Sequence, residues 1–561
     1  MPPLWTDSRR LFGPSLWTAG PGAVLDAALD PQQRDAELER WRAAVQSMVH
    51  ALGWTTEPTV HRYRDRAILA FTAPLDALMT ATLVNEWAWT VAAADGARRA
   101  TAIYHDDPPD APPLPLAESD TIEAARLARA AEANPRAIAM QARAATERVP
   151  FLFDDDGVSV GYGLRSMSWL PRDLPNPDEV PWRELGIIPV ALVTGSNGKT
   201  TTVRLVAAML ARAGHTVGYC CSDGVFIDGD CVERGDWSGP AGARTVLRDR
   251  RVTAAVLETA RGGMLRRGVV VPHATVAIVT NIAEDHFGGY GIESLGDLAR
   301  VKLGVAHALA NESVLVLNAD DPTLAALQQA SAGHVEWFSE REAGTITPAP
   351  TEMPLALGGA ARHNIANAVG AAHVAIAMGV SRAVIDDTLR TFGRDNADNA
   401  GRLERFDVRG VRVWVDYAHN PHGLGALLHA AAAEQGNGRL GLLLGQAGDR
   451  EDDAIRALAR TAWEARPARI VLKDVDGYMR GRVPGEVPAL LHEELRRAGA
   501  SEAVLSTVSA EADGVRALLA WAVPGDLLVL PVHALSARDA VIALLRRSGP
   551  AFSDSEMGSA M

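Results

Sequence analysis

A glycine-rich turn followed by a lysine and threonines occupies residues 195–202, GSNGKTTT. An apolar run, Ile187–Val193, precedes the turn and an amphipathic segment follows it, which is the order strand, loop, helix. The backbone N–H groups of such a loop converge on one point, and the dipole of the helix adds positive potential there, so the turn fits a phosphate. We expect Lys199 to reach the β- and γ-phosphates of a nucleotide and the Thr200 hydroxyl to bind Mg²⁺.

The remaining nucleotide contacts predicted in this turn come from Gly195, Asn197, Gly198 and Thr201. The turn is a short variant, TGxNGKT, because Val193 stands where the standard phosphate loop has a glycine. The alternative is an ordinary strand-to-helix turn with a chance Gly-Lys-Thr, but the flanking strand and helix favour the phosphate loop.

Two further strand ends carry groups that can do chemistry. Glu258 follows the apolar run Ala254–Leu257, and His286 follows the run Val276–Asn281. In an open α/β sheet ligands bind at the carboxyl ends of the strands, so Glu258 is a candidate for Mg²⁺. His286 is a candidate metal ligand or a structural histidine. Lys302, in ARVKLGVAHA, reads on composition alone as a surface lysine.

Three polar positions can address a nucleoside. Asn364 and Asn367 share one helix face and can contact a flat polar group such as adenine, or they can cap helices. Asp416 ends the run Val411–Tyr417, where a carboxylate can accept from ribose hydroxyls or can begin a turn ahead of a proline.

The composition indicates a globular protein of several domains. The chain has 561 residues, 47% hydrophobic and 22% charged, and a net charge of −14. Such an acidic chain is a poor partner for nucleic acid, and no run has the length of a membrane span, so we expect neither partner. Without a secretory leader pattern, the cysteines Cys220, Cys221 and Cys231 are interpreted as reduced thiols of a cytoplasmic protein.

The pattern of apolar runs predicts an α/β fold in three parts. Residues 1–165 form a small α/β domain, in which Tyr104–Ser119 is a proline-rich linker, residues 120–148 are helical and 151–163 form a hairpin. Residues 187–400 and 401–561 each alternate strands and helices, which predicts parallel sheets covered on both faces.

Taken in order, these motifs resemble those of the Mur ligase family, ATP-dependent enzymes that join an amine to a carboxylate. The matching blocks are TGSNGKT (194–200), LET (257–259), TNIAEDH (280–286), ARVK (299–302), LNADDP (317–322), ARHNIANA (361–368), GRLE (401–404) and VDYAHNP (415–421). The resemblance spans residues 187–545. It implies a central ATP-binding domain of the phosphate-loop type and a Rossmann-like C-terminal domain.

The resemblance also implies roles for these residues. Thr200, Glu258 and His286 would hold Mg²⁺, and Lys302 would be catalytic, carbamylated as in many relatives. Asn364 and Asn367 would face the adenine of ATP. Arg402 and Asp416 would reach the nucleotide from the C-terminal domain, so that domain closure assembles the site. The expected cofactors are ATP and Mg²⁺.

A more specific resemblance is to the Mur-ligase half of cyanophycin synthetases. It rests on SDGVFIDGD (222–230), VLETARGGMLRRGV (256–269), GDRED (448–452) and MRGRVP (479–484). It implies that His419, Asn420, Asp449, Arg450, Arg480 and Arg482 contact small-molecule, amino-acid or peptide substrates, although the arginines can equally form salt bridges at the rim. Residues 148–169 resemble only the beginning of the ATP-grasp domain of those enzymes.

The sequence allows two interpretations of the function and two of the tryptophans in the N-terminal domain. The chain is either an amide-forming ligase or a non-catalytic ATP-binding partner that regulates a separate synthetase, and it can form a homodimer. The N-terminal domain is expected to dock or to present substrate. The tryptophans of VNEWAWTVA (84–92) either hold it against the central domain or form its own core.

Overall fold

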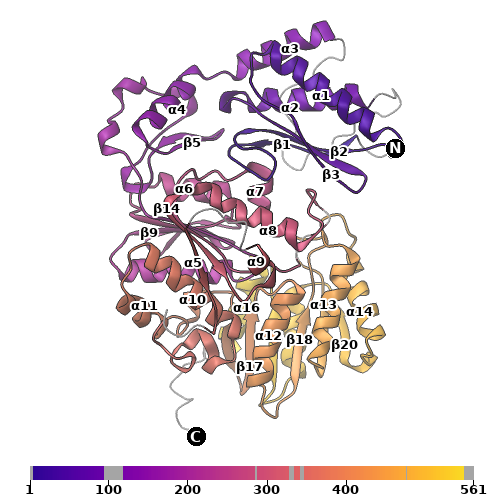
Figure 1. Ribbon diagram of the computed structural model, residues 1–561. Helices are drawn as coiled ribbons and strands as arrows, with labels where there is room; N and C mark the ends of the chain where they lie inside the picture. Colours follow the sequence, from indigo (N-terminus) through magenta and orange to yellow (C-terminus); the bar gives the residue numbers. More distant parts are fainter. Residues whose placement is uncertain are drawn as a thin grey trace.

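The computed structural model has three sheet-containing domains stacked along the molecule, with a small linking sheet between the first two (Figure 1). It describes residues 4–93, 118–284, 287, 289–327, 334–341, 346–475 and 477–548. The predicted linker up to residue 117 and the candidate ligand His286 lie outside the described residues.

The N-terminal domain is a four-stranded antiparallel sheet in the order β1-β2-β4-β3 with two helices on one face. Its elements are β1 (Trp5–Leu11), β2 (Gly22–Ala28), α1 (Arg34–Ala51), β3 (Thr59–Tyr63), β4 (Arg66–Thr72) and α2 (Leu78–Ala92). Trp87 and Trp89 of α2 are buried with Trp41 of α1, in the core between the helices and the sheet. The tryptophans therefore form the domain's own core and do not dock it.

The opposite face of this sheet is what packs on the central domain. Leu11, Val24 and Ile68 from three of its strands share one hydrophobic core with central-domain residues such as Leu257 and Leu265. The burial pattern of β1, buried at every second residue, places its side chains alternately on the two faces.

The linking segment contains α3 (Glu118–Glu132), α4 (Pro135–Glu147) and a three-stranded antiparallel sheet of β5 (Phe151–Phe153), β6 (Val158–Val160) and β7 (Met167–Trp169). The predicted hairpin is confirmed, because Phe151 pairs with Val160. The single predicted helical segment is two helices. The Asn134 side chain accepts from the N–H of Ala137 and Pro135 occupies the first turn, so a new helix begins there.

The central domain holds an eight-stranded sheet in the order β11-β10-β9-β12-β8-β13-β14-β15. The strands are β8 (Val190–Thr194), β9 (Val217–Cys221), β10 (Gly224–Ile227), β11 (Asp230–Arg234), β12 (Ala254–Glu258), β13 (Ala274–Val279), β14 (Leu309–Asn318) and β15 (His334–Phe338). Neighbouring strands are parallel in the part of the sheet ordered β9-β12-β8-β13-β14-β15, as predicted. β10 and β11 extend the β9 edge of the sheet in antiparallel pairing.

Helices cover both faces of this sheet, which explains the continuous apolar runs of its strands. One face carries α5 (Lys199–Arg212), α10 (Arg362–Ala377) and α11 (Arg382–Leu389), and the other carries α6 (Pro240–Arg248), α7 (Arg261–Arg267) and α8 (Leu295–Leu303). A short helix, α9 (Pro322–Ala326), follows β14.

The C-terminal domain is a six-stranded sheet in the order β16-β17-β21-β18-β19-β20, parallel except for β16. Its strands are β16 (Glu404–Val408), β17 (Val411–Asp416), β18 (Leu440–Leu444), β19 (Arg469–Lys473), β20 (Leu505–Val508) and β21 (Leu527–Pro531). One face is covered by α12 (Pro421–Glu434), α13 (Asp452–Glu464) and α14 (Glu486–Arg497), the other by α15 (Glu511–Trp521) and α16 (Leu535–Ser548). The predicted α/β fold class is confirmed.

Two sequence-level observations have structural counterparts. Cys220 and Cys221 are buried free thiols and Cys231 is an exposed one, so no disulfide joins them. Among the helices of the described residues, none combines the length and the apolar character needed to cross a membrane.

Candidate active site

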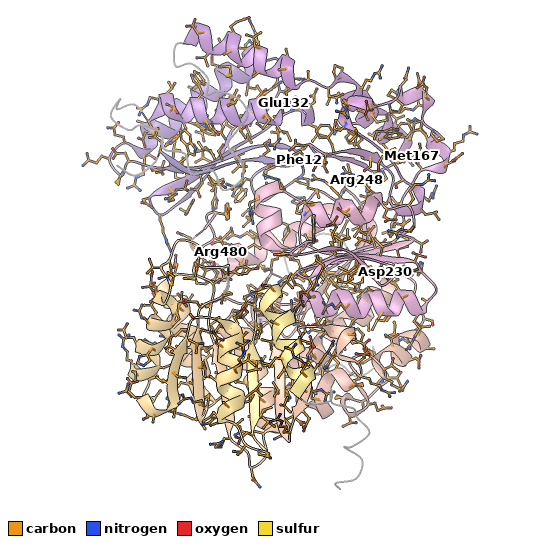
Figure 2. All side chains as sticks on the ribbon, turned by 180° about the vertical axis from the view of Figure 1, so that it is seen from behind. Phe12, Glu132, Met167, Asp230, Arg248 and Arg480 are labelled. Atoms are coloured by element: carbon orange, nitrogen blue, oxygen red, sulfur yellow. The ribbon has the colours of Figure 1, made fainter. Side chains whose placement is uncertain are left out.

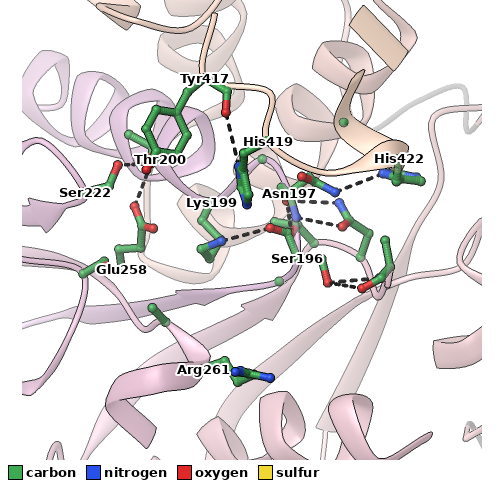
Figure 3. Close-up of a pocket in the computed structure, with 18 of the residues that line it drawn as sticks. Ser196, Asn197, Lys199, Thr200, Ser222, Glu258, Arg261, Tyr417, His419 and His422 are labelled. Carbon is green, nitrogen blue, oxygen red and sulfur yellow. Dashed lines mark hydrogen bonds between the residues drawn. The ribbon is translucent and has the colours of Figure 1, made fainter. Parts of the chain in front are cut away.

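The phosphate loop connects β8 to α5 and has the backbone that its glycines predict. Gly195 has φ +147° and Gly198 has φ +82°, conformations that side chains with a Cβ rarely adopt. A Cβ on Gly195 would lie 1.8 Å from Thr280 Oγ1, so the neighbouring strand end leaves no space for one. Lys199 opens α5, and its Nζ donates to the carbonyl of Ser196 at 3.0 Å (Figure 3). The lysine is therefore folded over the loop.

A carboxylate lies directly beside this loop. In the parallel register Glu258 of β12 is opposite Val193 of β8, so the strand end carries Glu258 to the loop. The Thr200 hydroxyl donates to Glu258 Oε2 at 2.8 Å, and it also lies 3.2 Å from Ser222 Oγ (Figure 3). Burial raises the pKa of Glu258, and the ammonium of Lys199 opposes that rise. A hydroxyl and a carboxylate are hard oxygen ligands of the kind that Mg²⁺ prefers.

Lys302 is buried, with 3% of its surface exposed, and is not the surface lysine that its composition suggests. Its Nζ donates to the carbonyl of Gly195 at 2.7 Å, which fixes the first residue of the phosphate loop from α8. Lys302 also lines the same cavity as the loop.

The segment after β13 is held against the loop from two sides. Thr280 Oγ1 donates to the carbonyl of Asn197 at 2.6 Å, and Asn281 Oδ1 accepts from the N–H of Asn197 at 2.9 Å. Asp321 accepts from the N–H of Ile282 at 2.6 Å while it caps α9. The segment that leads to His286 is thus positioned at the loop. Among the described residues no three His, Cys, Asp or Glu side chains are grouped to hold a metal ion.

Asn364 and Asn367 lie together on α10, on the wall of the cavity. Asn364 Nδ2 donates to the carbonyl of Leu355, and Asn367 Nδ2 donates to Asn364 Oδ1 at 3.2 Å. A Cβ on Gly198 would meet Asn367 Oδ1, so this amide packs against the phosphate loop. Neither asparagine caps α10, whose N-cap is Ala361.

Arg402 and Asp416 face the loop from the C-terminal domain. The Arg402 guanidinium stacks on the ring of Tyr417, 4.3 Å from its centroid, and donates to Ser222 Oγ at 2.8 Å. Asp416 accepts from the N–H groups of Leu403 and Ala418 at 2.8 and 2.7 Å. Burial raises the pKa of Asp416, and Arg402 opposes the rise.

A polar chain with a defined direction joins the two domains. Asn420 caps α12 by accepting from the N–H of Gly423, so its amide nitrogen is left to donate to Asn197 Oδ1 at 3.0 Å. Asn197 Nδ2 therefore donates, and His422 Nδ1, 3.0 Å away, accepts (Figure 3). His422 can accept only when it is neutral, and burial lowers the pKa of His422.

The other predicted substrate contacts divide into two groups. Asp449, Arg450, Arg480 and His419 line the cavity, and the carboxylate of Asp449 pairs with both Arg450 and Arg480. Arg482 and Asn420 do not line it. Arg482 donates to the carbonyls of Gly448 and Arg450 and pairs with Asp452 and Glu486, so it braces the loop that carries Asp449.

Apart from Arg482 and Asn420, the predicted site residues that the structure describes line one cavity of about 1850 Å³ between the central and C-terminal domains. Its wall also contains residues that the motifs did not single out: Asp236, Arg261, Arg266, Tyr290, Tyr417, His422 and His533. Tyr417 and His422 lie inside or beside VDYAHNP and could have been found from that motif. The two arginines stand in ARGGMLRRG (260–268), the extension of LET, a stretch whose spacing names no known site.

Family models match both domains that form the cavity. Residues 193–375 match the Mur ligase middle domain, and residues 401–531 match the glutamate ligase domain of Mur ligases. The UDP-N-acetylmuramoyl-L-alanyl-D-glutamate--2,6-diaminopimelate ligase of Corynebacterium efficiens is 31% identical over 62% of this chain and 69% of that protein. The chain belongs to the Mur ligase family.

Within this family, the chain is similar to cyanophycin synthetases. That of Synechocystis sp. is 36% identical over 54% of this chain and 38% of that protein. The chain thus spans between 38% and 41% of the length of the cyanophycin synthetases reported in these comparisons. Among solved structures, E. coli FolC in complex with ADP is 22% identical over 64% of this chain and 90% of that chain, with a TM-score of 0.48. The predicted resemblance to Mur ligases is confirmed.

Proposed function

We propose that this Mur ligase uses ATP to join an amino-acid-like carboxylate to an amine, through an acyl phosphate, with release of ADP and phosphate. The observation that carries the proposal is the hydrogen-bonded pair Thr200–Glu258 beside Lys199, at a phosphate loop that opens into the interdomain cavity.

The phosphate-binding step is supported by the groups that converge at the loop. Lys199 carries the charge that the β- and γ-phosphates need, and its ammonium has only to release the Ser196 carbonyl to reach them. Thr200 and Glu258 would hold Mg²⁺, which when bound neutralises phosphate charge. We assign a second Mg²⁺ to His286, and we propose that Lys302 orients the loop through Gly195.

The nucleoside would lie towards α10 and the C-terminal domain. The amides of Asn364 and Asn367 offer donors and acceptors at the edge of a base, and Asp416 offers a carboxylate to a ribose hydroxyl. Arg402 is directed at Thr200 and Ser222 and would add a second positive charge near the phosphates.

The chemical step would run in two stages. An oxygen of the donor carboxylate attacks the γ-phosphorus, and the bond from that phosphorus to the bridging oxygen breaks, which releases ADP and leaves an acyl phosphate. The amine nitrogen then attacks the carbonyl carbon, loses a proton and expels phosphate, which leaves the amide. Both stages need charge neutralisation more than a covalent enzyme intermediate. His419, Asp449, Arg450 and Arg480 would receive the amine substrate at the C-terminal side of the cavity.

The test is a screen of amino-acid and dipeptide pairs with the full chain, ATP and Mg²⁺, read by ADP release and by mass spectrometry of the products. Hydroxylamine replaces the amine in a parallel set, because it traps an acyl phosphate as a hydroxamate whatever the natural amine is. The expected result is ADP release and a condensed product for at least one pair, both absent in Lys199→Ala. Tight ATP binding without ADP release or hydroxamate under any condition would instead favour a non-catalytic ATP-binding partner.

A further inference from the structure

A group of arginines forms the end of the cavity that lies away from the C-terminal domain. Arg261, Arg266 and Arg267 stand on α7, and Arg244 stands on the neighbouring helix α6; all four line the cavity. Figure 3 shows the Arg261 side chain across an open space from Lys199 and Ser196. None of these arginines is used in the proposed handling of ATP.

The charges at this wall repel one another. Burial, together with the positive charges of Arg248 and Arg267, lowers the pKa of Arg244 to about 10, although Asp154 pairs with Arg244 at 3.2 Å and opposes the shift. Arg266 is exposed to the cavity, and the only group it donates to among the described residues is the carbonyl of Gly262, at 3.4 Å. An anion placed here would relieve this repulsion.

The wall is held in place by the N-terminal domain. The N–H of Phe12 donates to the carbonyl of Arg267 at 2.8 Å, and Arg9 Nε donates to the carbonyl of Leu265 at 2.9 Å. The Arg9 guanidinium lies between the rings of Trp17 and Tyr290, 4.9 and 4.8 Å from their centroids, and Tyr290 itself lines the cavity. Figure 2 shows Phe12 reaching from the N-terminal sheet toward the α6 helix that carries Arg248.

The spacing to the phosphate site is set by the chain itself. Glu258 ends β12 and Arg261 begins α7, three residues later. Three residues span at most ~11 Å, so one small molecule can touch both ends.

We propose that Arg261 and Arg266 form an anion subsite, so that the carboxyl donor carries, besides the carboxylate that is phosphorylated, a further anionic group bound at α7. The subsite rests on the proposed function, since it defines the donor of that reaction. Arginine forks bind carboxylate and phosphate oxygens in the same bidentate way, so both are sources of the second group. Arg244 and Arg267 support the subsite from behind, and the N-terminal domain positions it.

The test measures binding of a matched pair of probes by calorimetry without nucleotide. N-acetyl-aspartyl-glutamate carries three carboxylates, and N-acetyl-asparaginyl-glutamine has nearly the same shape with one. We expect the acidic probe to bind at least tenfold more tightly to the wild type, and the double variant Arg261→Ala/Arg266→Ala to reduce this ratio below threefold. Arg251→Ala removes an exposed arginine that is paired with Asp249 outside the cavity, and it should leave the ratio unchanged.

ADP titrations of the same variants show whether the fold and the nucleotide site are intact, and ADP affinity should change by less than twofold. N-acetyl-O-phosphoserine forms a further arm: binding tighter than that of the acidic dipeptide, lost in the double variant, would identify phosphate as the second group. Equal binding of the two dipeptides, no measurable binding of either, or a ratio unaffected by the double variant would overturn the subsite. If no pair of substrates releases ADP but the acidic probe binds as expected, the result supports the anion subsite and contradicts the proposed ligase function.

Discussion

The two sides of the nucleotide site are built in different ways. On the central-domain side, Lys199 and Thr200 begin α5, Glu258 ends the strand beside β8, and buried Lys302 fixes the loop. On the C-terminal side, the contacts cross a domain boundary through single polar groups. The groups that would do chemistry are therefore held within the central domain itself, whereas Arg402 and Asp416 reach the site from a second domain.

An ion cluster near the boundary shows how the C-terminal side is attached. Asp223, in the turn between β9 and β10, pairs with Arg204 of α5 and with Arg538 of α16 in the C-terminal domain. Burial opposes ionisation of this carboxyl, but Arg402, Arg204 and Arg538 together hold the pKa of Asp223 below its usual range. A buried carboxylate shared by two domains restricts their relative orientation without filling the cavity.

The largest effect is expected from Lys199→Ala. It removes the charge partner of the phosphates on the central-domain side, so ATP turnover should fall by at least ~100-fold, while the midpoint of thermal unfolding stays within a few degrees. Steady-state ADP release and a melting curve measure the two quantities. Arg212→Ala, at the exposed far end of the same helix, is the matched control. Near-normal turnover of the Lys199 variant would remove the loop from the mechanism.

Glu258→Gln should act through the metal. The amide can still accept from the Thr200 hydroxyl, so the fold is retained, but the charge that binds Mg²⁺ is lost. We expect the Mg²⁺ concentration for half-maximal turnover to rise ~10- to 100-fold. A magnesium titration at saturating ATP measures it, and a curve that overlays the wild type would show that the metal is held elsewhere.

A smaller effect is expected on the C-terminal side, from Arg402→Ala. The variant removes a guanidinium that stacks on Tyr417 and bonds to Ser222, and it should reduce kcat/KM for ATP ~10-fold, about the value of one charged hydrogen bond. Tyr417→Phe keeps the ring and should stay within twofold of the wild type. If Arg402→Ala lowers turnover as much as Lys199→Ala, the contrast between the two sides is wrong.

The smallest effect concerns pH and His422. Because burial lowers the pKa of His422, the neutral ring that accepts from Asn197 persists at neutral pH and is lost as pH falls through the lowered value. In the unfolded chain His422 takes up a proton as pH falls below about 6.5, before the folded protein does. The free energy of unfolding therefore falls by up to ~1 kcal/mol over that range. The KM for ATP should rise a few-fold in the wild type as pH falls through the lowered pKa of His422, after subtraction of the change seen in His422→Ala. An identical pH profile in the two proteins would contradict the assigned direction of the polar chain.

What the sequence predicts well is what neighbouring residues decide. The glycine turn, the strand ends at Glu258 and Asp416 and the alternation of strands and helices all follow from local pattern. The role of Lys302 could be predicted only from the resemblance to Mur ligases, because no pattern in its own helix indicates that this lysine is buried beside Gly195. The link between Asn197 and His422 joins residues 225 positions apart, and only the packing of two domains creates it.

The helix break at Asn134 teaches a related lesson. Both signals, an N-cap residue and a proline directly after it, are present in the sequence, but the alanine-rich stretch around them favours one continuous helix. Arg482 is the reverse case. Its motif suggests a substrate contact, while its side chain is taken up by two carbonyls of the loop it braces and by the carboxylates of Asp452 and Glu486.

The shared core beneath the N-terminal sheet has a practical consequence for anyone who dissects this protein. Leu11, Trp17, Val24 and Ile68 are buried against the central domain, and each such side chain contributes roughly 1.5–3 kcal/mol when it leaves water. A shortened chain that starts at the phosphate-loop strand would expose the apolar partners of these residues to solvent as a continuous hydrophobic surface. Such a fragment should precipitate or associate with itself, and a failure to purify it would reflect this lost cover and not a defect of the nucleotide site.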